Sequence, residues 1–182
     1  MTLTLQEQRD RCGYLSVNEL PKFSELRDAL PKNPVVVNIG AGAGTSGMMF
    51  MQREDLTLHT VDIQGRGHPL GSLESERNAF ALAGLSDQLG VRWFQHEGDS
   101  KIVGNEWTDD KVTLVYVDGN HTYEGVRGDI AAWKPHVKRW GYMVFHDYGT
   151  YAASVTQTVD ELMADAKRLW HVDGLVAFRI TK

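Results

Sequence analysis

The sequence predicts a single α/β domain built on a doubly wound, mostly parallel sheet of seven strands. Two observations lead to this prediction. Short apolar runs rich in β-branched residues alternate with amphipathic stretches of about 10–15 residues, which is typical of repeated strand–helix–strand units. The runs are apolar throughout rather than alternating, as expected for strands that helices cover on both faces.

Seven strands are expected along the chain. Five of them are the apolar runs, which span residues 34–40, 56–62, 91–99, 112–118 and 142–147. The last two come from the segment RLWHVDGLVAFRI, in which Asp173-Gly174 separates two strand-like runs. That dipeptide is a hairpin signal, so the sheet should end in a C-terminal antiparallel hairpin.

Helices are expected in the intervals between the strands. The first lies at about 19–30, and another should start at Ser72, a suitable N-cap. Apolar residues at helical spacing predict a helix over 126–134, which Pro135 ends, and another over 155–166. Trp107, in the polar segment GNEWTDD, is a candidate for an exposed side chain.

Length and composition narrow the class of protein. A chain of 182 residues suits one domain over 1–182, with 1–33 as a helical lead-in. The single cysteine, Cys12, and the lack of an apolar leader favour a cytoplasmic protein. No run approaches the ~20 apolar residues of a membrane span. The net charge of −5, without a basic block, disfavours nucleic acid as a partner.

Polar residues follow all five predicted parallel strands. A Rossmann-like sheet binds its ligands at the carboxyl ends of its strands, so these residues mark the expected site. They are Gly40, Asp62, Asp99, Asp118 and the pair His146-Asp147. Each is an ordinary turn residue when taken alone. Together they predict a polar rim on an apolar sheet, for which a purely structural domain has little use.

Glycines follow the first strand in the segment NIGAGAGTSG. Gly40, Gly42 and Gly44 alternate there, and glycine lets both a tight turn and a ligand approach the backbone. Gly42, Gly44 and Gly47 also fit the dinucleotide fingerprint G-x-G-x-x-G. The glycine closest to the strand is Gly40, however, and the spacing from it better suits a nucleoside without a pyrophosphate.

Acidic residues after the next two strands suit the rest of such a ligand. Asp62, 22 residues beyond Gly40, can accept hydrogen bonds from both hydroxyls of a ribose. Asp99 followed by Ser100 can hold an adenine amino group. The alternative for each is a plain strand-end turn.

The sequence resembles the class I S-adenosylmethionine-dependent methyltransferases over about residues 34–150. The segment VVVNIGAGAGTS resembles their first motif, and the segment from Val115 to Gly149 resembles a group with D-G-x-H-x-Y and F-H-D motifs. Members of that group include small-molecule and sugar O-methyltransferases. Two residues depart from the pattern. Asn38 replaces the usual acid, which weakens a contact to the cofactor's amino group, and Trp140 replaces a usual glycine.

The resemblance implies S-adenosyl-L-methionine as cofactor and a small-molecule acceptor, for example a sugar, methylated on oxygen. The implied cofactor-binding residues are Asn38, Gly40, Ala41, Gly42, Gly44, Asp62, Ile63, Gly98, Asp99, Ser100, Asp118, Gly119 and His121. The acceptor pocket is expected from the N-terminal segment, the 64–72 loop and residues 148–153. Two other functions stay open at this point: an NAD(P)-dependent oxidoreductase that uses the Gly42–Gly47 fingerprint, and a noncatalytic cofactor-binding partner subunit. A homodimer is one oligomeric state that the sequence allows.

Catalysis is expected from the residues after the fourth and fifth strands. His121 and His146, beside Asp118, are the candidates for removing a proton from the acceptor hydroxyl. The alternative for each histidine is a structural role. Asp118, His146 and Asp147 also form a candidate site for Mg²⁺ or another divalent cation. In the competing interpretation these carboxylates only position cofactor or substrate.

Overall fold

The computed structural model describes residues 15–63, 73–109, 111–150 and 152–182. Its strands are β1 (Val35–Ile39), β2 (Thr57–Asp62), β3 (Trp93–Glu97), β4 (Val112–Val117), β5 (Val137–Phe145), β6 (Lys167–Val172) and β7 (Leu175–Arg179). They form one sheet in the order β3-β2-β1-β4-β5-β7-β6. β1 to β5 pair in parallel, and β7 runs antiparallel to both β5 and β6. The predicted doubly wound sheet with a C-terminal hairpin is confirmed.

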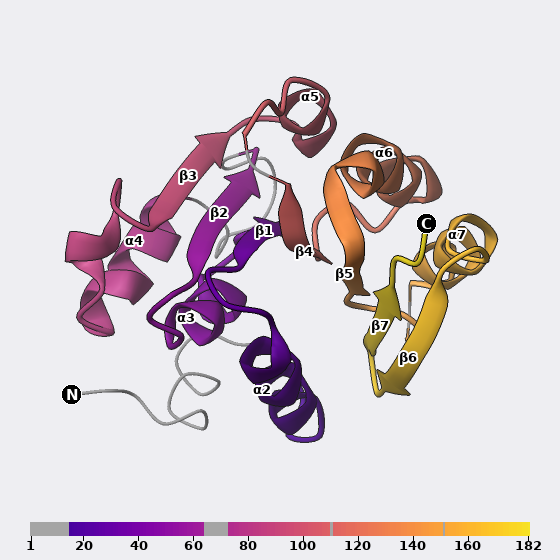
Figure 1. The fold of residues 1–182 in the computed structure, drawn as a ribbon, viewed down its shortest axis with the longest axis horizontal. Coiled ribbons are helices and arrows are strands. Elements are labelled where there is room, and N and C mark those ends of the chain that lie inside the picture. Colours follow the sequence, from indigo (N-terminus) through magenta and orange to yellow (C-terminus); the bar gives the residue numbers. More distant parts are fainter. Residues whose placement is uncertain (1–14, 64–72, 110, 151) are drawn as a thin grey trace.

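Helices cover both faces of this sheet (Figure 1). They are α2 (Glu19–Ala29), α3 (Thr45–Met51), α4 (Leu73–Leu82), α5 (Ser100–Asn105), α6 (Tyr123–Trp133) and α7 (Ala153–Leu162), with short 3-10 turns at Ser86–Gln88 and Lys134–His136. α6 and α7 share one apolar core with the sheet, and α2, α3 and α4 share the other. Val36 lies in the second core and Val37 in the first, which is why the strands are apolar throughout. No helix of the described ranges is long and apolar enough to span a membrane.

Several boundaries differ from the prediction. β5 begins at Val137, five residues before the predicted start, because the exposed residues Lys138, Arg139 and Trp140 and then Gly141 interrupt its apolar pattern. α5 was not predicted, since the turn-like segment Gly-Asp-Ser hides its start. Trp107 is buried at 8% exposure against Trp133 and His59, so the expectation of an exposed side chain is wrong. The predicted cap Ser72, the 64–72 loop and residues 1–14 lie outside the described residues.

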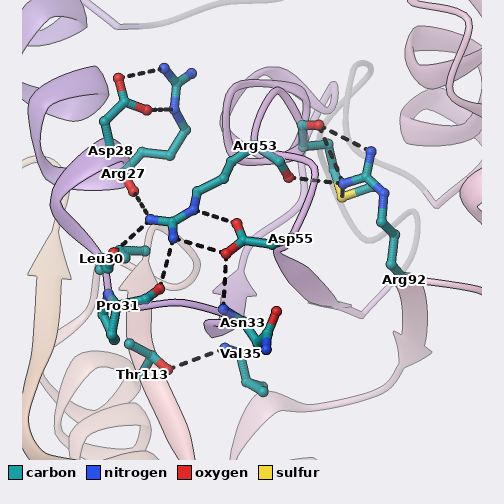
Figure 2. A network of polar contacts seen from close by, with 11 residues as sticks. Arg27, Asp28, Leu30, Pro31, Asn33, Val35, Arg53, Asp55, Arg92 and Thr113 are labelled. Carbon is teal, nitrogen blue, oxygen red and sulfur yellow. Dashed lines mark hydrogen bonds and ion pairs between the residues drawn. The ribbon is translucent and has the colours of Figure 1, made fainter.

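Arginine side chains tie the loops together at the edge where β1, β2 and β3 begin (Figure 2). The Arg53 guanidinium donates to the carbonyl oxygens of Arg27 (3.0 Å) and Leu30 (2.7 Å) at the end of α2. Arg92 donates to the carbonyl oxygen of Arg53 (3.0 Å). Guanidinium groups thus satisfy carbonyl groups that the end of a helix leaves free. The contacts at this end of the strands stabilise the packing of loops, and the candidate site lies at the opposite end, where the parallel strands finish.

Candidate functional site

The polar strand ends lie together along the carboxyl edge of the sheet, because β1 to β5 are parallel. Backbone hydrogen bonds continue the ladder one residue beyond the strands. Asp118 N donates to Ile39 O at 2.9 Å, and His146 N donates to Val117 O at 3.0 Å. The backbone therefore fixes the relative positions of the residues that follow β1, β4 and β5.

The glycine loop after β1 has a left-handed backbone at each alternating glycine. The φ angles are +82° at Gly40, +51° at Gly42 and +93° at Gly44. A Cβ on Gly40 would lie 2.1 Å from the carbonyl oxygen of Asp118, so this glycine lets the ends of β1 and β4 approach each other. A Cβ on Gly42 would meet no heavy atom within 4 Å, so the backbone borders open space there.

Gly47 and Glu76 pack against each other behind this loop. A Cβ on Gly47 would lie 3.0 Å from the Phe80 ring and 3.1 Å from Glu76 Oε1. Packing of α3 on α4 therefore accounts for the third glycine of the dinucleotide fingerprint without any dinucleotide. Glu76 is fully buried and accepts from Thr60 Oγ1 (2.9 Å) and Gln95 Nε2 (2.7 Å). Burial raises the pKa of Glu76 to about 7.

Asp62 and Asn38 both contact the segment that follows β1. Asp62 Oδ2 accepts from the Gly42 amide at 3.2 Å, so its carboxylate lies at the open side of the loop. Asn38 is fully buried and donates to Ser46 Oγ at 3.0 Å, which ties β1 to α3. Ile63, next to Asp62, is 54% exposed at the same edge.

Asp99 and Ser100 start the unpredicted helix α5. Asp99 is its N-cap and accepts from the Lys101 amide at 2.9 Å, while its side chain stays 40% exposed. The Ser100 hydroxyl donates to Asp129, a buried carboxylate on α6 whose burial raises its pKa to about 6. The Asp99 carboxylate also pairs with Lys101 Nζ at 3.2 Å but keeps exposed surface that a ligand could contact, whereas Ser100 is engaged with α6.

Four side chains from the ends of β4 and β5 form an acid–imidazole cluster: Asp118, His121, His146 and Asp147. His121 Nε2 lies 2.9 Å from Asp147 Oδ2 and 3.7 Å from Asp118 Oδ1. His146 Nδ1 lies 3.3 Å from Asp118 Oδ1 and 3.4 Å from Asp147 Oδ2. Asp147 adopts a left-handed φ of +59°, a strained conformation that such sites often retain. The D-G-x-H motif, through Asp118 and His121, therefore contacts the F-H-D motif, through His146 and Asp147.

Charge in this cluster determines its protonation. The carboxylates of Asp118 and Asp147 raise the pKa of His121 to about 9. Burial opposes the charged form of His146, but Asp118, Asp147 and Glu19 outweigh it and raise its pKa. Burial likewise disfavours ionised Asp147, and the two imidazoles outweigh it and lower its pKa. Near neutral pH both rings are therefore protonated and Asp147 is ionised.

Glu19 was missed by the sequence reasoning, although it contacts this cluster. Its side chain is 3% exposed, and its Oε2 lies 3.6 Å from His146 Nε2. It also accepts from the amides of Ser16 (2.6 Å) and Gly174 (2.8 Å). Glu19 thus joins α2, the turn between β6 and β7, and His146. A glutamate in the first turn of a helix is ordinarily exposed, so no sequence signal marks it.

Three members of the cluster have the arrangement of a cation site. One ligand atom from each of Asp118, His121 and Asp147 lies within 4.8 Å of the others. The predicted set contained His146 instead of His121. His121 is the more accessible ring, at 38% side-chain exposure against 9% for His146. Two carboxylates and one imidazole are ligands that divalent cations accept.

Solved structures with the same fold include several methyltransferases. The O-methyltransferase NovP has a TM-score of 0.70 and 17% identity, over 90% of this chain and 81% of NovP. MycE methyltransferase, from the mycinamycin pathway and solved with Mg and S-adenosylhomocysteine, has a TM-score of 0.64 and 17% identity, over 100% of this chain and 56% of MycE. CalS11, a TDP-rhamnose 3'-O-methyltransferase, has a TM-score of 0.62 and 14% identity, over 88% of this chain and 80% of CalS11.

Sequence comparison identifies the family. No curated protein matches the sequence significantly. A family described as "Methyltransferase domain" matches residues 37–148, which is more than half of the chain. The matched region runs from within β1 to the residue after Asp147, so it contains the glycine loop and the whole acid–imidazole cluster. The chain belongs to this methyltransferase family.

Proposed function

We propose that this protein, acting as one domain over residues 1–182, transfers a methyl group from S-adenosylmethionine to a hydroxyl oxygen of a small molecule. The observation that carries the proposal is the shared edge of the sheet. An open, left-handed glycine loop and an acid–imidazole cluster lie there side by side, joined by the backbone bond from Asp118 to Ile39. The glycine loop suits a nucleoside ligand, and the acid–imidazole cluster suits the removal of a proton from an acceptor hydroxyl.

The cofactor is assigned to the strand ends from β1 to β4. The loop over Gly40, Ala41, Gly42 and Gly44 would hold the methionine part, since the Gly42 backbone borders open space. Asp62 would accept from the ribose hydroxyls, because its carboxylate lies at the same opening. The adenine would contact the residues that lie next to Asp62 and at the end of β3, which are Ile63, Gly98, Asp99 and Ser100. Asn38 is assigned a supporting role, since its amide is used by Ser46.

The sulfonium of S-adenosylmethionine is already an activated electrophile, so alignment of the acceptor is the main task of the protein. Asp118, Gly119 and His121 would border the transferred methyl group. A divalent cation held by Asp118, His121 and Asp147 would act as a Lewis acid toward a bound hydroxyl. A cation would also displace the proton of His121, whose neutral ring would then serve as a ligand, and the hydroxyl polarised by the cation would lose its proton to solvent water. The buried ring of His146 would keep the two carboxylates in place.

The acceptor is assigned to a small hydroxylated molecule. CalS11, whose fold this chain shares, is named as a methyltransferase of a nucleotide-linked sugar, TDP-rhamnose. The acid–imidazole cluster suits a sugar or catechol hydroxyl, whose proton must leave during transfer. α2 would form one wall of the pocket, since Glu19 brings its first turn against His146.

Methyl transfer from radiolabelled S-adenosylmethionine to a panel of sugars, nucleotide-linked sugars and catechols tests the proposal. We expect transfer to at least one acceptor, and its loss in Asp118→Asn. Treatment with EDTA followed by addition of Mg²⁺ tests the cation separately. Full activity in EDTA would remove the cation from the mechanism. His121 would then have to lose its own proton before accepting one, so activity should rise as the pH approaches its pKa of about 9. Absence of S-adenosylhomocysteine binding would contradict the whole proposal.

A further inference from the structure

A bulge near the start of β5 extrudes three residues from the sheet. Val112 of β4 pairs with Val137 of β5, and the next pair is Leu114 with Tyr142. β4 therefore advances by two residues where β5 advances by five. The extra residues are Lys138, Arg139 and Trp140, and all three are exposed. The bulge lies at the opposite end of β5 from His146 and belongs to no part of the cofactor site.

Trp140 is held in a strained conformation at the tip of this bulge. Its φ is +69°, in the left-handed region, and 51% of its surface is exposed. The bonds from Trp140 N to Ile180 O (2.7 Å) and from Ile180 N to Gly141 O (2.9 Å) fix the backbone on either side. Glycine would adopt this φ without strain. A bulky residue held there with its ring in solvent favours a functional role over a folding role.

Two guanidinium groups lie near the Trp140 ring, and Arg179 Nε also donates to the Trp140 carbonyl oxygen at 3.3 Å. The guanidinium carbons of Arg139 and Arg179 lie 5.1 Å and 5.9 Å from its centroid, within cation–π range. Lys167 pairs with Arg179 in the ladder between β6 and β7, and Lys138 begins the bulge. Within the described part of the chain, no carboxylate forms an ion pair with any of these four cations. The patch is basic although the whole chain carries a net charge of −5.

We propose that Trp140 and these four cations form a docking surface for an acidic segment of a partner protein. Tryptophan and arginine are the residues most enriched at binding hot spots, and guanidinium groups bind carboxylates through two parallel hydrogen bonds. Single-stranded nucleic acid suits the surface less well. Its bases stack on free aromatic faces, whereas Arg139 and Arg179 already lie against this ring.

Binding of a fluorescein-labelled peptide of ten glutamates to the full chain at low salt tests this surface by fluorescence anisotropy. We expect the wild type to bind, and Trp140→Gly to weaken binding by at least about tenfold, the size of a hot-spot loss. Trp140→Gly keeps the charge and removes the backbone strain, so it should fold. Arg179→Gln should weaken binding to a similar degree. Arg127→Gln is the matched control, since Arg127 is 58% exposed on α6 and paired with Glu124, and its affinity should stay within about twofold of the wild type.

Protection of Trp140 provides a second readout, because the other tryptophans are buried or partly buried. Bound peptide should reduce acrylamide quenching in the wild type but not in Trp140→Gly. Three results would overturn the proposal: no peptide binding by the wild type, equal weakening in Arg127→Gln, or tighter binding of a labelled decauridylate than of the peptide. A dimer in sedimentation velocity that Trp140→Gly dissociates would assign the surface to a second copy of this chain instead. None of these results depends on methyl transfer.

Discussion

Alanine substitutions at Gly40 and Gly42 should separate the structural role of the glycine loop from its ligand role. Gly40→Ala places a Cβ 2.1 Å from the carbonyl oxygen of Asp118, and the backbone there has φ +82°. The left-handed conformation costs a non-glycine residue about 1–2 kcal/mol. The overpacked contact adds about 1–3 kcal/mol. We therefore expect Gly40→Ala to lower the free energy of unfolding by about 2–5 kcal/mol.

Gly42→Ala carries only the conformational cost, about 1–2 kcal/mol, because its Cβ would meet no heavy atom within 4 Å. That Cβ would, however, occupy space that we assign to the cofactor. Urea denaturation should find Gly42→Ala the more stable variant, and calorimetric titration should find its affinity for S-adenosylhomocysteine lowered at least about tenfold. Wild-type affinity in Gly42→Ala would show that the open space is not cofactor space. Equal stability of the two variants would refute the steric argument at Gly40.

Three further predictions concern buried charge. The pKa of Glu76 is about 7 in the folded chain and about 4.5 otherwise, so its folded form binds the proton more tightly and stability falls as pH rises through that window. Glu76→Gln should remove this loss of stability, which is about 3 kcal/mol. In urea denaturation the variant should be more stable than the wild type at pH 8 but not at pH 4. An equal effect at both pH values would contradict this reasoning. Asp147→Asn removes one of the two carboxylates that hold the pKa of His121 at about 9, so NMR titration should find that pKa lowered, and an unchanged value would exclude the contact. Glu19→Gln should lower kcat for methyl transfer about tenfold and leave S-adenosylhomocysteine affinity unchanged, while the exposed Glu25→Gln on the same helix changes neither; a parallel loss of kcat, affinity and stability in Glu19→Gln would indicate a purely structural role.

The sheet and its rim were predictable from sequence because burial on both faces leaves a direct pattern. Val36 and Val37 pack into different cores, so β1 had to be apolar at successive positions. The rim followed from the order of strands, since parallel strands share one carboxyl edge. The motifs then predicted which polar residues belong to that edge.

The parts that escaped prediction depend on contacts between distant segments. Glu19 is buried because Ser16, Gly174 and His146 surround it, and none of these contacts follows from helical periodicity. Trp107 stands in a polar segment but packs on Trp133 of α6. The candidate cation site contains His121 in place of His146 because of side-chain positions that no motif gives: Asp147 Oδ2 lies 2.9 Å from His121 Nε2 and 3.4 Å from His146 Nδ1.

Calorimetric titration of the wild type and Asp62→Ala with S-adenosylhomocysteine and with NAD tests the central claim most directly. The claim predicts binding of S-adenosylhomocysteine by the wild type, a large loss of that affinity in Asp62→Ala, and no binding of NAD by either protein. Binding of NAD without binding of S-adenosylhomocysteine would contradict the assignment of the strand-end site to the methyl donor.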